Sequence, residues 1–181
     1  MPFLPTMPDS ATLLDVFKAF PEASRPLIEF HEVVLRGPSP FSEAEREPIA
    51  THVSGLNACR YCRGVHAATT ERLGIAPDVV GSLVDGIDTA LVAERMRPVL
   101  RYAEKLTRNP AGLTQADADA VLAAGWDATA LFHTVAVTAL FNFMNRLVEG
   151  LGIELDAAYV EPAAKRLAER GYLPLIKMLE S

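Results

Sequence analysis

The stretch EPIATHVSGLNACRYCRGVH, residues 47–66, contains both cysteines of the 181-residue chain. Asn57 in this stretch is a residue type that is typical of a helix cap, so we predict a helix over residues 59–73. Successive helix residues are about 100° apart, so positions i, i+3 and i+7 share one face. Cys59, Cys62 and His66 occupy these positions. The stretch therefore predicts a helix that begins at two thiols and carries a histidine on the same face.

The residues on both sides of this stretch are also helical in pattern. Ser42 and Glu45 form a capping box, and the helix that they open either kinks at Pro48 or begins near Glu47. The other predicted helices cover residues 11–20, 26–35, 93–107, 114–125, 127–150, 156–170 and 173–179. No segment has the alternation that is typical of a strand. We predict an all-α fold of about seven to nine helices without a β-sheet, in one domain over residues 1–181 with its core at 42–155.

Charge and cysteine content exclude several classes of function. A formal net charge of −6 and a pI near 5.2 do not supply the clustered Lys and Arg that nucleic-acid binding requires. The two cysteines are three residues apart, whereas a secreted disulfide scaffold would have more cysteines at wider spacings. The first ten residues lack the basic start of a secretory signal. We therefore expect a cytoplasmic protein that does not bind nucleic acid.

Residues 128–144 are apolar enough to raise the question of a membrane span. The segment includes a histidine, an asparagine and three threonines. It is also short for a bilayer, which needs about 20 apolar residues. We expect a buried core helix or a subunit-interface helix, and no membrane contact. Asn142, Asn145 and Arg146 form a polar cluster that we interpret as hydrogen-bonding partners at a subunit interface or a loop.

The cysteine pair has the features of a reactive thiol centre. A free thiol with a pKa of about 8.5 is mostly protonated at neutral pH, whereas the thiolate is the nucleophile. The N-terminal end of a helix stabilises negative charge, and a histidine four residues after Cys62 can accept the thiol proton. A second cysteine can capture a sulfenic acid as a disulfide before it is oxidised further. These residues suffice for a cycle that reduces peroxides.

Zinc binding is the main alternative from the residues alone. Structural zinc needs four ligands, and Cys59, Cys62 and His66 supply three. His31 or His52 would have to supply the fourth, because the sequence has no second CxxC pair. We predict no metal and no bound organic cofactor, and we keep zinc binding or redox sensing by the CxxC pair as alternative functions.

Residues 47–66 resemble the core of the AhpD and carboxymuconolactone decarboxylase family. That core has a glutamate twelve residues before the first cysteine and then the pattern Cys-x-x-Cys-x-x-x-His, and Glu47 stands twelve residues before Cys59. The segments YAEKLT at 102–107, GW at 125–126 and FNFMNR at 141–146 resemble the branch of peroxidase-related proteins. The resemblance covers roughly residues 25–155 and implies an AhpD-like helical bundle.

The resemblance implies a thiol peroxidase that reduces small organic hydroperoxides. In the family the cysteine nearer the histidine attacks the peroxide, which corresponds to Cys62, and the other cysteine, here Cys59, resolves. Glu47 and His66 would form the proton relay that activates Cys62. One departure from the family pattern is Tyr61, which stands where well-characterised members have a second histidine, so we expect a shorter relay.

The resemblance also implies partners. An external dithiol, either a lipoyl group or a thioredoxin-like protein, would regenerate the enzyme. The chain would form a homo-oligomer, a trimer or a hexamer, with the active site near a subunit contact. The same scaffold hosts carboxymuconolactone decarboxylases, which generally lack the cysteine pair. The presence of both cysteines favours the peroxidase over that alternative.

Overall fold

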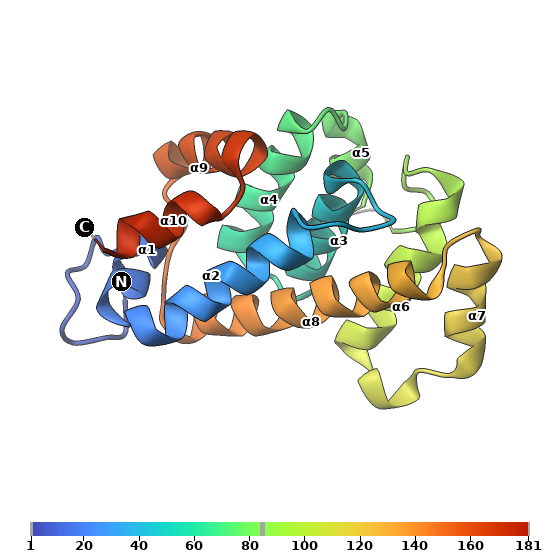
Figure 1. Cartoon of the computed structure of the whole chain (residues 1–181), viewed down its shortest axis with the longest axis horizontal. Coiled ribbons are helices and arrows are strands. Elements are labelled where there is room, and N and C mark those ends of the chain that lie inside the picture. The colour runs from blue at the N-terminus through green and yellow to red at the C-terminus, as the bar shows by residue number, and fades with distance from the viewer. Residues whose placement is uncertain (1, 84–85, 181) are drawn as a thin grey trace.

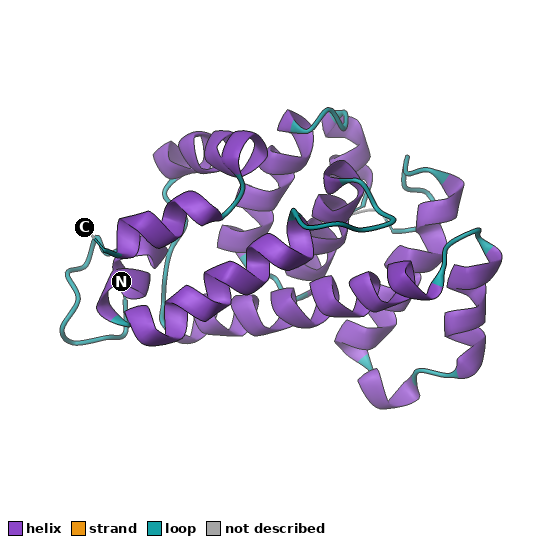
Figure 2. Cartoon of the chain, in the orientation of Figure 1, coloured by secondary structure: helices purple, strands orange, loops and turns teal. Residues whose placement is uncertain are grey.

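The computed structural model describes residues 2–83 and 86–180, and every regular element in these residues is helical. Figure 2 shows helices joined by short loops. The α-helices are α1 Leu13–Ala19, α2 Pro21–Leu35, α3 Glu43–Leu56, α4 Arg60–Arg72, α5 Pro77–Ser82, α6 Arg97–Arg108, α7 Gln115–Ala123, α8 Ala128–Gly150, α9 Ala157–Arg170 and α10 Leu173–Leu179. Two short 3-10 helices are η1 Glu94–Met96 and η2 Pro110–Gly112. The prediction of an all-α fold is confirmed for the described part of the chain.

The long helix α8 runs along the molecule, and α2, α3, α4, α6 and α7 pack against it (Figure 1). Its side chains Val137, Phe141 and Val148 are almost completely buried. Length and hydropathy would let α8 cross a membrane, but more than half of its most apolar window is buried inside the chain. The buried hydroxyls of Thr134 and Thr138 donate to carbonyls four residues earlier in α8. The structure shows that this segment is a core helix, and a role at a subunit interface stays a prediction.

Helix starts are where the structure differs most from the sequence prediction. α2 begins at Pro21 and not at residue 26, because Pro21 already suits the first helical turn. α3 begins at Glu43, directly after the Ser42 capping box, and continues through Pro48. The alternative start near Glu47 is therefore wrong. The sequence prediction lacks α5. It treats Pro77 as the end of the preceding helix, whereas Pro77 is also the first residue of α5.

A tight turn joins α3 to α4 and places the cysteines. The Ala58 amide donates to the Gly55 carbonyl and the Cys59 amide donates to the Ser54 carbonyl, both at 3.0 Å. These two bonds form the Schellman motif that ends many helices. Ala58 has the left-handed backbone that this motif requires, with φ of +55°, where glycine is the usual residue. Cys59 therefore closes the turn after α3 and is also the N-cap of α4.

Candidate functional site

The two cysteines lie side by side at the start of α4. Cys59 is the N-cap residue and Cys62 lies in the first turn, so both thiols are close to the positive end of the helix. The cysteines are 3.5 Å apart, and both are free and buried. The predicted helical face therefore brings the pair together, at a separation from which a disulfide can form with a small movement.

The two thiols differ in acidity because they share a hydrogen bond. The Cys62 thiol donates to the Cys59 sulfur and lowers the pKa of Cys59, although burial acts against this, and the Cys62 backbone N–H adds a second bond. The same bond raises the pKa of Cys62 well above its usual range, and burial and the charge on Cys59 add to the effect. The two thiols therefore titrate as a coupled pair, in which the shared hydrogen bond favours the thiolate at Cys59.

Glu47 and His66, the two residues of the relay that the resemblance implies, are in direct contact. Glu47 on α3 is completely buried, and its Oε2 lies 2.6 Å from Nδ1 of His66 on α4. Burial alone would raise the pKa of Glu47, but the charges and hydrogen bonds of His66 and Arg36 outweigh burial and lower that pKa. An ionised Glu47 accepts the Nδ1–H proton, so Nε2 is the ring nitrogen of His66 that can take up a proton.

Arg36 is a member of this network that sequence reasoning missed. It is the C-cap residue of α2, and its Nη2 donates to Oε1 of Glu47 at 2.6 Å. Its other nitrogens donate to the carbonyls of Leu35 and Leu167. With only 5% of its side chain exposed, Arg36 is a buried counter-charge that holds Glu47 as a carboxylate. No local pattern around residue 36 indicates this role, because the pair depends on how α2 packs beside α3.

A mostly apolar cavity of about 70 Å³ adjoins Cys62 and His66. Aromatic rings make up much of its wall, and the edge of the Phe141 ring packs on His66 with centroids 4.5 Å apart. Other lining side chains are Phe17, Ile28, His31, Tyr61, Val65, Met144, Tyr159, Leu167 and Tyr172. Cys62 therefore lines a cavity that suits an apolar molecule.

Tyr61 has a partner on another helix. It is buried beside Tyr159 of α9, with ring centroids 6.0 Å apart, and both rings line the apolar cavity. Burial and then the contact with Tyr159 raise the pKa of Tyr61 far above its usual value. Tyr61 is therefore a neutral residue in the cavity wall, at the position where the family pattern has a second histidine.

Asparagines of α8 hold the turn that carries the cysteines. Asn57 Nδ2 donates to the side-chain oxygens of Asn142 at 3.1 Å and Asn145 at 2.9 Å, and Asn145 Nδ2 donates to Ser54 Oγ at 3.0 Å. Asn145 also contributes a bond that lowers the pKa of Cys62, against the larger effects that raise it. The polar cluster predicted for a subunit interface or a loop therefore binds the α3–α4 turn within the same chain.

The described residues contain no group of three or more His, Cys, Asp and Glu side chains arranged to hold a metal ion. His31 Nδ1 lies 2.7 Å from the Leu27 carbonyl, and burial lowers the pKa of His31 to about 4. His52 lines a different cavity from the one beside Cys62. A four-ligand zinc site that includes either histidine is not assembled among these residues.

Solved structures of AhpD-like and peroxidase-related proteins share this architecture. No protein-family model and no curated protein matches the sequence. An uncharacterized peroxidase-related protein from Silicibacter sp. TM1040 matches with a TM-score of 0.76 and 28% identity, over 81% of this chain and 77% of its own. This structural neighbour supports the resemblance to the AhpD-like, peroxidase-related family. Another AhpD-like structure, an uncharacterized peroxidase-related protein from Ralstonia eutropha JMP134 described as an alkylhydroperoxidase AhpD core, matches with a TM-score of 0.75 and 23% identity over 80% of this chain and 76% of its own.

The same AhpD-like fold also supports other chemistry. The debrominase Bmp8, solved in complex with 2,3,4-tribromopyrrole, matches with a TM-score of 0.71 and 17% identity, over 86% of this chain and 81% of its own. At that identity the likeness extends to the fold alone. The function of this AhpD-like chain therefore has to be argued from its own side chains.

Proposed function

We propose that the chain is a thiol peroxidase that reduces organic hydroperoxides through a dithiol–disulfide cycle. One observation carries the proposal: of two free thiols 3.5 Å apart, Cys62 lines an apolar cavity together with a histidine that is bonded to a buried glutamate. An alkyl hydroperoxide has an apolar body and a polar end, which matches an apolar wall with a thiol and an imidazole in it. The peroxidase-related neighbours support the same class of enzyme.

The attacking thiol in this proposal is Cys62, because it lines the cavity together with His66. The Cys62 sulfur bonds to the terminal peroxide oxygen as the O–O bond breaks, which gives a sulfenic acid and an alcohol. The thiol proton passes to Nε2 of His66 and from there to the departing alkoxide. The raised pKa of Cys62 is the reason that a base is needed, and Glu47 stabilises the protonated imidazole that forms.

Cys59 suits the second step. The Cys62 backbone N–H also lowers the pKa of Cys59 and remains in place after Cys62 is oxidised, so it favours a Cys59 thiolate within 3.5 Å of the sulfenic acid. This thiolate attacks the Cys62 sulfur and displaces hydroxide, which leaves as water, and the Cys59–Cys62 disulfide forms. Two thiols thereby lose two electrons to one hydroperoxide. We propose that an external dithiol, lipoyl or thioredoxin-like, returns these electrons in a cytoplasmic setting.

The proposal is tested by adding one equivalent of cumene hydroperoxide to the fully reduced protein. Intact mass and free thiols are followed in the wild type, Cys62→Ser and Cys59→Ser. We expect the wild type to lose two hydrogens and both thiols within seconds. Cys59→Ser is expected to retain a sulfenic acid that dimedone traps, whereas Cys62→Ser reacts no faster than a free thiol.

Two results would overturn this assignment. Oxidation of the wild type at the rate of an ordinary free thiol would exclude peroxidase activity and favour a redox-sensing function. Fast oxidation that survives Cys62→Ser but is lost in Cys59→Ser would retain the peroxidase and reverse the order of the two cysteines.

We further propose that the chain forms a homo-oligomer. Phe132 and Phe143 on α8 and Phe30 and Val33 on α2 have about half or more of their surface exposed. Large exposed apolar side chains are typical of interfaces between subunits. Multi-angle light scattering at several protein concentrations measures the subunit number, and a monomer at all concentrations would contradict the proposal.

A further inference from the structure

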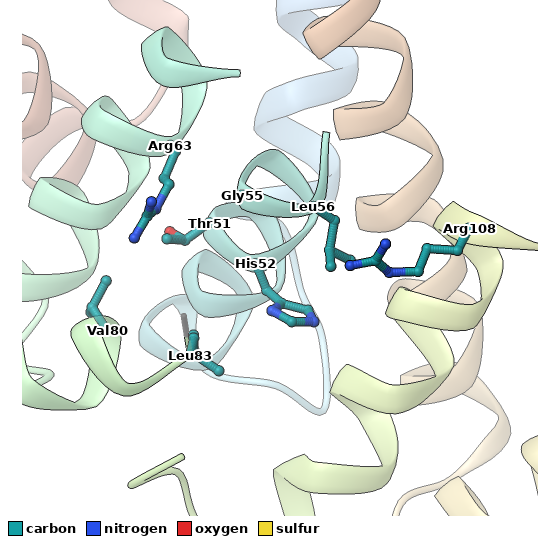
Figure 3. Close-up of a pocket in the computed structure, with 8 residues that line it drawn as sticks. All are labelled: Thr51, His52, Gly55, Leu56, Arg63, Val80, Leu83 and Arg108. Atoms are coloured by element: carbon teal, nitrogen blue, oxygen red, sulfur yellow. The ribbon is translucent and has the colours of Figure 1, made fainter. Parts of the chain in front are cut away.

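A second cavity lies between α3, α4, α5 and α6, with a volume of about 190 Å³ (Figure 3). It shares no lining residue with the apolar cavity beside Cys62. Its lining differs in kind, because two arginines, a histidine and a threonine contribute to it. The proposed peroxidase cycle uses none of these side chains, so the cavity calls for a separate explanation.

Two buried polar groups in this cavity have no hydrogen-bond partner among the described residues. They are Oγ1 of Thr51 and Nε2 of His52, in side chains of residues that are 3% and 6% exposed. The carboxylate of Glu104 faces His52, but its Oε2 lies 4.0 Å from Nε2, beyond hydrogen-bond distance. Buried polar groups are almost always paired in folded proteins, so two unpaired ones in one cavity indicate a ligand that pairs them.

The positively charged side chains around the cavity favour a ligand with a negative charge. Arg63 of α4 is exposed, and it makes no ion pair and no side-chain hydrogen bond with the rest of the described chain. Its side chain lies against α3, because a Cβ placed on Gly55 would be 3.7 Å from Cδ of Arg63. Figure 3 shows the Arg63 guanidinium and the Thr51 hydroxyl on the same side of α3. A guanidinium and a hydroxyl both donate to the oxygens of a carboxylate.

The other arginine of the cavity is less free to bind. Arg108 of α6 approaches from the opposite side of α3 in Figure 3, and its Nε donates to Oε1 of Glu104 at 3.0 Å. Burial is the largest cause of the lowered pKa of His52, and Arg108 acts in the same direction while Glu104 opposes it. A neutral imidazole can donate from Nε2 to an acceptor. Arg63, Thr51 and His52 are therefore the side chains that can donate hydrogen bonds to the oxygens of a ligand.

The remaining wall is apolar. Leu56, Val80 and Leu83 line the cavity, where Val80 belongs to α5 and Leu83 is the C-cap residue of α5. An inorganic anion would leave this apolar surface uncovered, whereas a carboxylate with a short hydrocarbon body would cover it. We propose that this cavity binds a small organic carboxylate, whose oxygens accept hydrogen bonds from Arg63 and Thr51 and whose apolar body packs on Leu83.

The test is isothermal titration calorimetry on the full-length reduced protein in Tris chloride buffer. The titrants are sodium butyrate, hexanoate and benzoate, with butyramide as the uncharged counterpart and inorganic phosphate as the anion without an apolar body. The variants are R63Q and T51V. The matched control is R60Q, which removes an exposed arginine of the same helix that does not line the cavity.

We expect at least one of the carboxylates to bind saturably and butyramide to bind at least about tenfold more weakly. R63Q and T51V should each weaken binding about tenfold, which equals ~1.4 kcal/mol, because each removes a donor to the carboxylate. R60Q should change the affinity less than about twofold, because Arg60 does not line the cavity. T51V replaces an unpaired buried hydroxyl by a methyl group, so its midpoint of thermal unfolding should not fall, and lost binding in T51V cannot reflect lost folding.

Four results would overturn the proposal: no saturable binding of any of the three carboxylates up to millimolar concentrations, equal binding of butyramide, phosphate binding as tight as that of the carboxylates, or affinities unchanged in both R63Q and T51V. None of these readouts depends on peroxidase activity, so the carboxylate site and the proposed function can fail independently.

Discussion

The substitution Glu47→Gln is expected to destabilise the fold strongly at neutral pH with little change in shape. The amide has the size of the carboxylate but no charge. In the wild type the carboxylate is completely buried, and both Arg36 Nη2 and His66 Nδ1 lie 2.6 Å from its oxygens. The variant leaves the guanidinium of Arg36, 5% exposed, without its closest counter-charge.

The size of the effect follows from this burial. Removing one partner of a buried ion pair costs about 3–5 kcal/mol, because the other charge stays buried without compensation. Arg36 keeps its bonds to two backbone carbonyls, and Glu43 Oε2 remains 3.5 Å from its Nε. These contacts offset part of the loss, so we expect about 3 kcal/mol in the free energy of unfolding at pH 7.

The effect should also depend on pH in a defined direction. The pKa of Glu47 is lower in the folded protein than its ordinary value of 4.5, which holds in the unfolded chain. The stability that its charge provides is therefore complete above pH 4.5 and is lost as the pH falls through the lower folded pKa. The difference between wild type and Glu47→Gln should be largest near pH 7 and should shrink below pH 4.5.

Urea unfolding followed by far-ultraviolet circular dichroism at neutral and acidic pH measures both effects. Glu43→Gln is the matched control, because Glu43 faces the same arginine but its side chain is 43% exposed. An exposed ion pair of this kind contributes less than about 1 kcal/mol. Equal losses in the two variants, or a loss in Glu47→Gln that stays constant into the acid range, would refute the assignment of Glu47 as a buried, ionised partner of Arg36.

Three further predictions test the turn, the core and the thiol pair. Ala58→Gly removes an alanine from a backbone with φ of +55° and should raise the free energy of unfolding by about 0.5–1 kcal/mol, and an unchanged urea midpoint would contradict this. Trp126→Phe removes the indole N–H that donates to the Arg95 carbonyl at 2.8 Å, so it should lower the free energy of unfolding in urea by about 1–3 kcal/mol. An unchanged free energy of unfolding would contradict this prediction. Cys62→Ala removes the donor that lowers the pKa of Cys59, so the iodoacetamide reaction of Cys59 should shift to higher pH, and the same pH profile in both proteins would disprove that hydrogen bond.

The sequence could predict what depends on local pattern. The capping boxes at Ser42 and Thr114 mark the starts of α3 and α7 because their side-chain bonds span only three residues. The spacing of Cys59, Cys62 and His66 places all three on one helical face for the same reason. Their catalytic roles stay predictions, since geometry alone does not measure a reaction.

The rest of the site depends on contacts between distant segments. Arg36 reaches Glu47 because the end of α2 packs near α3, and residue 36 carries no motif of its own. Asn145 was recognised as part of a polar cluster, but its partners Ser54 and Asn57 are far away in sequence. The relative acidity of the two thiols depends on which of them donates the shared hydrogen bond. Patterns of residue types do not contain that information.

The turn between α3 and α4 also constrains how relatives of this chain can vary in length. Its two Schellman bonds end at Cys59, which immediately caps the next helix, so the connection has no spare residue. One inserted residue would turn the following helix by about 100° relative to the one before and would carry Cys62 away from the cavity wall. Insertions and deletions should therefore be rare between Glu47 and His66, and the spacing of these residues is a more dependable marker for finding homologues with the same centre than the residue types around them.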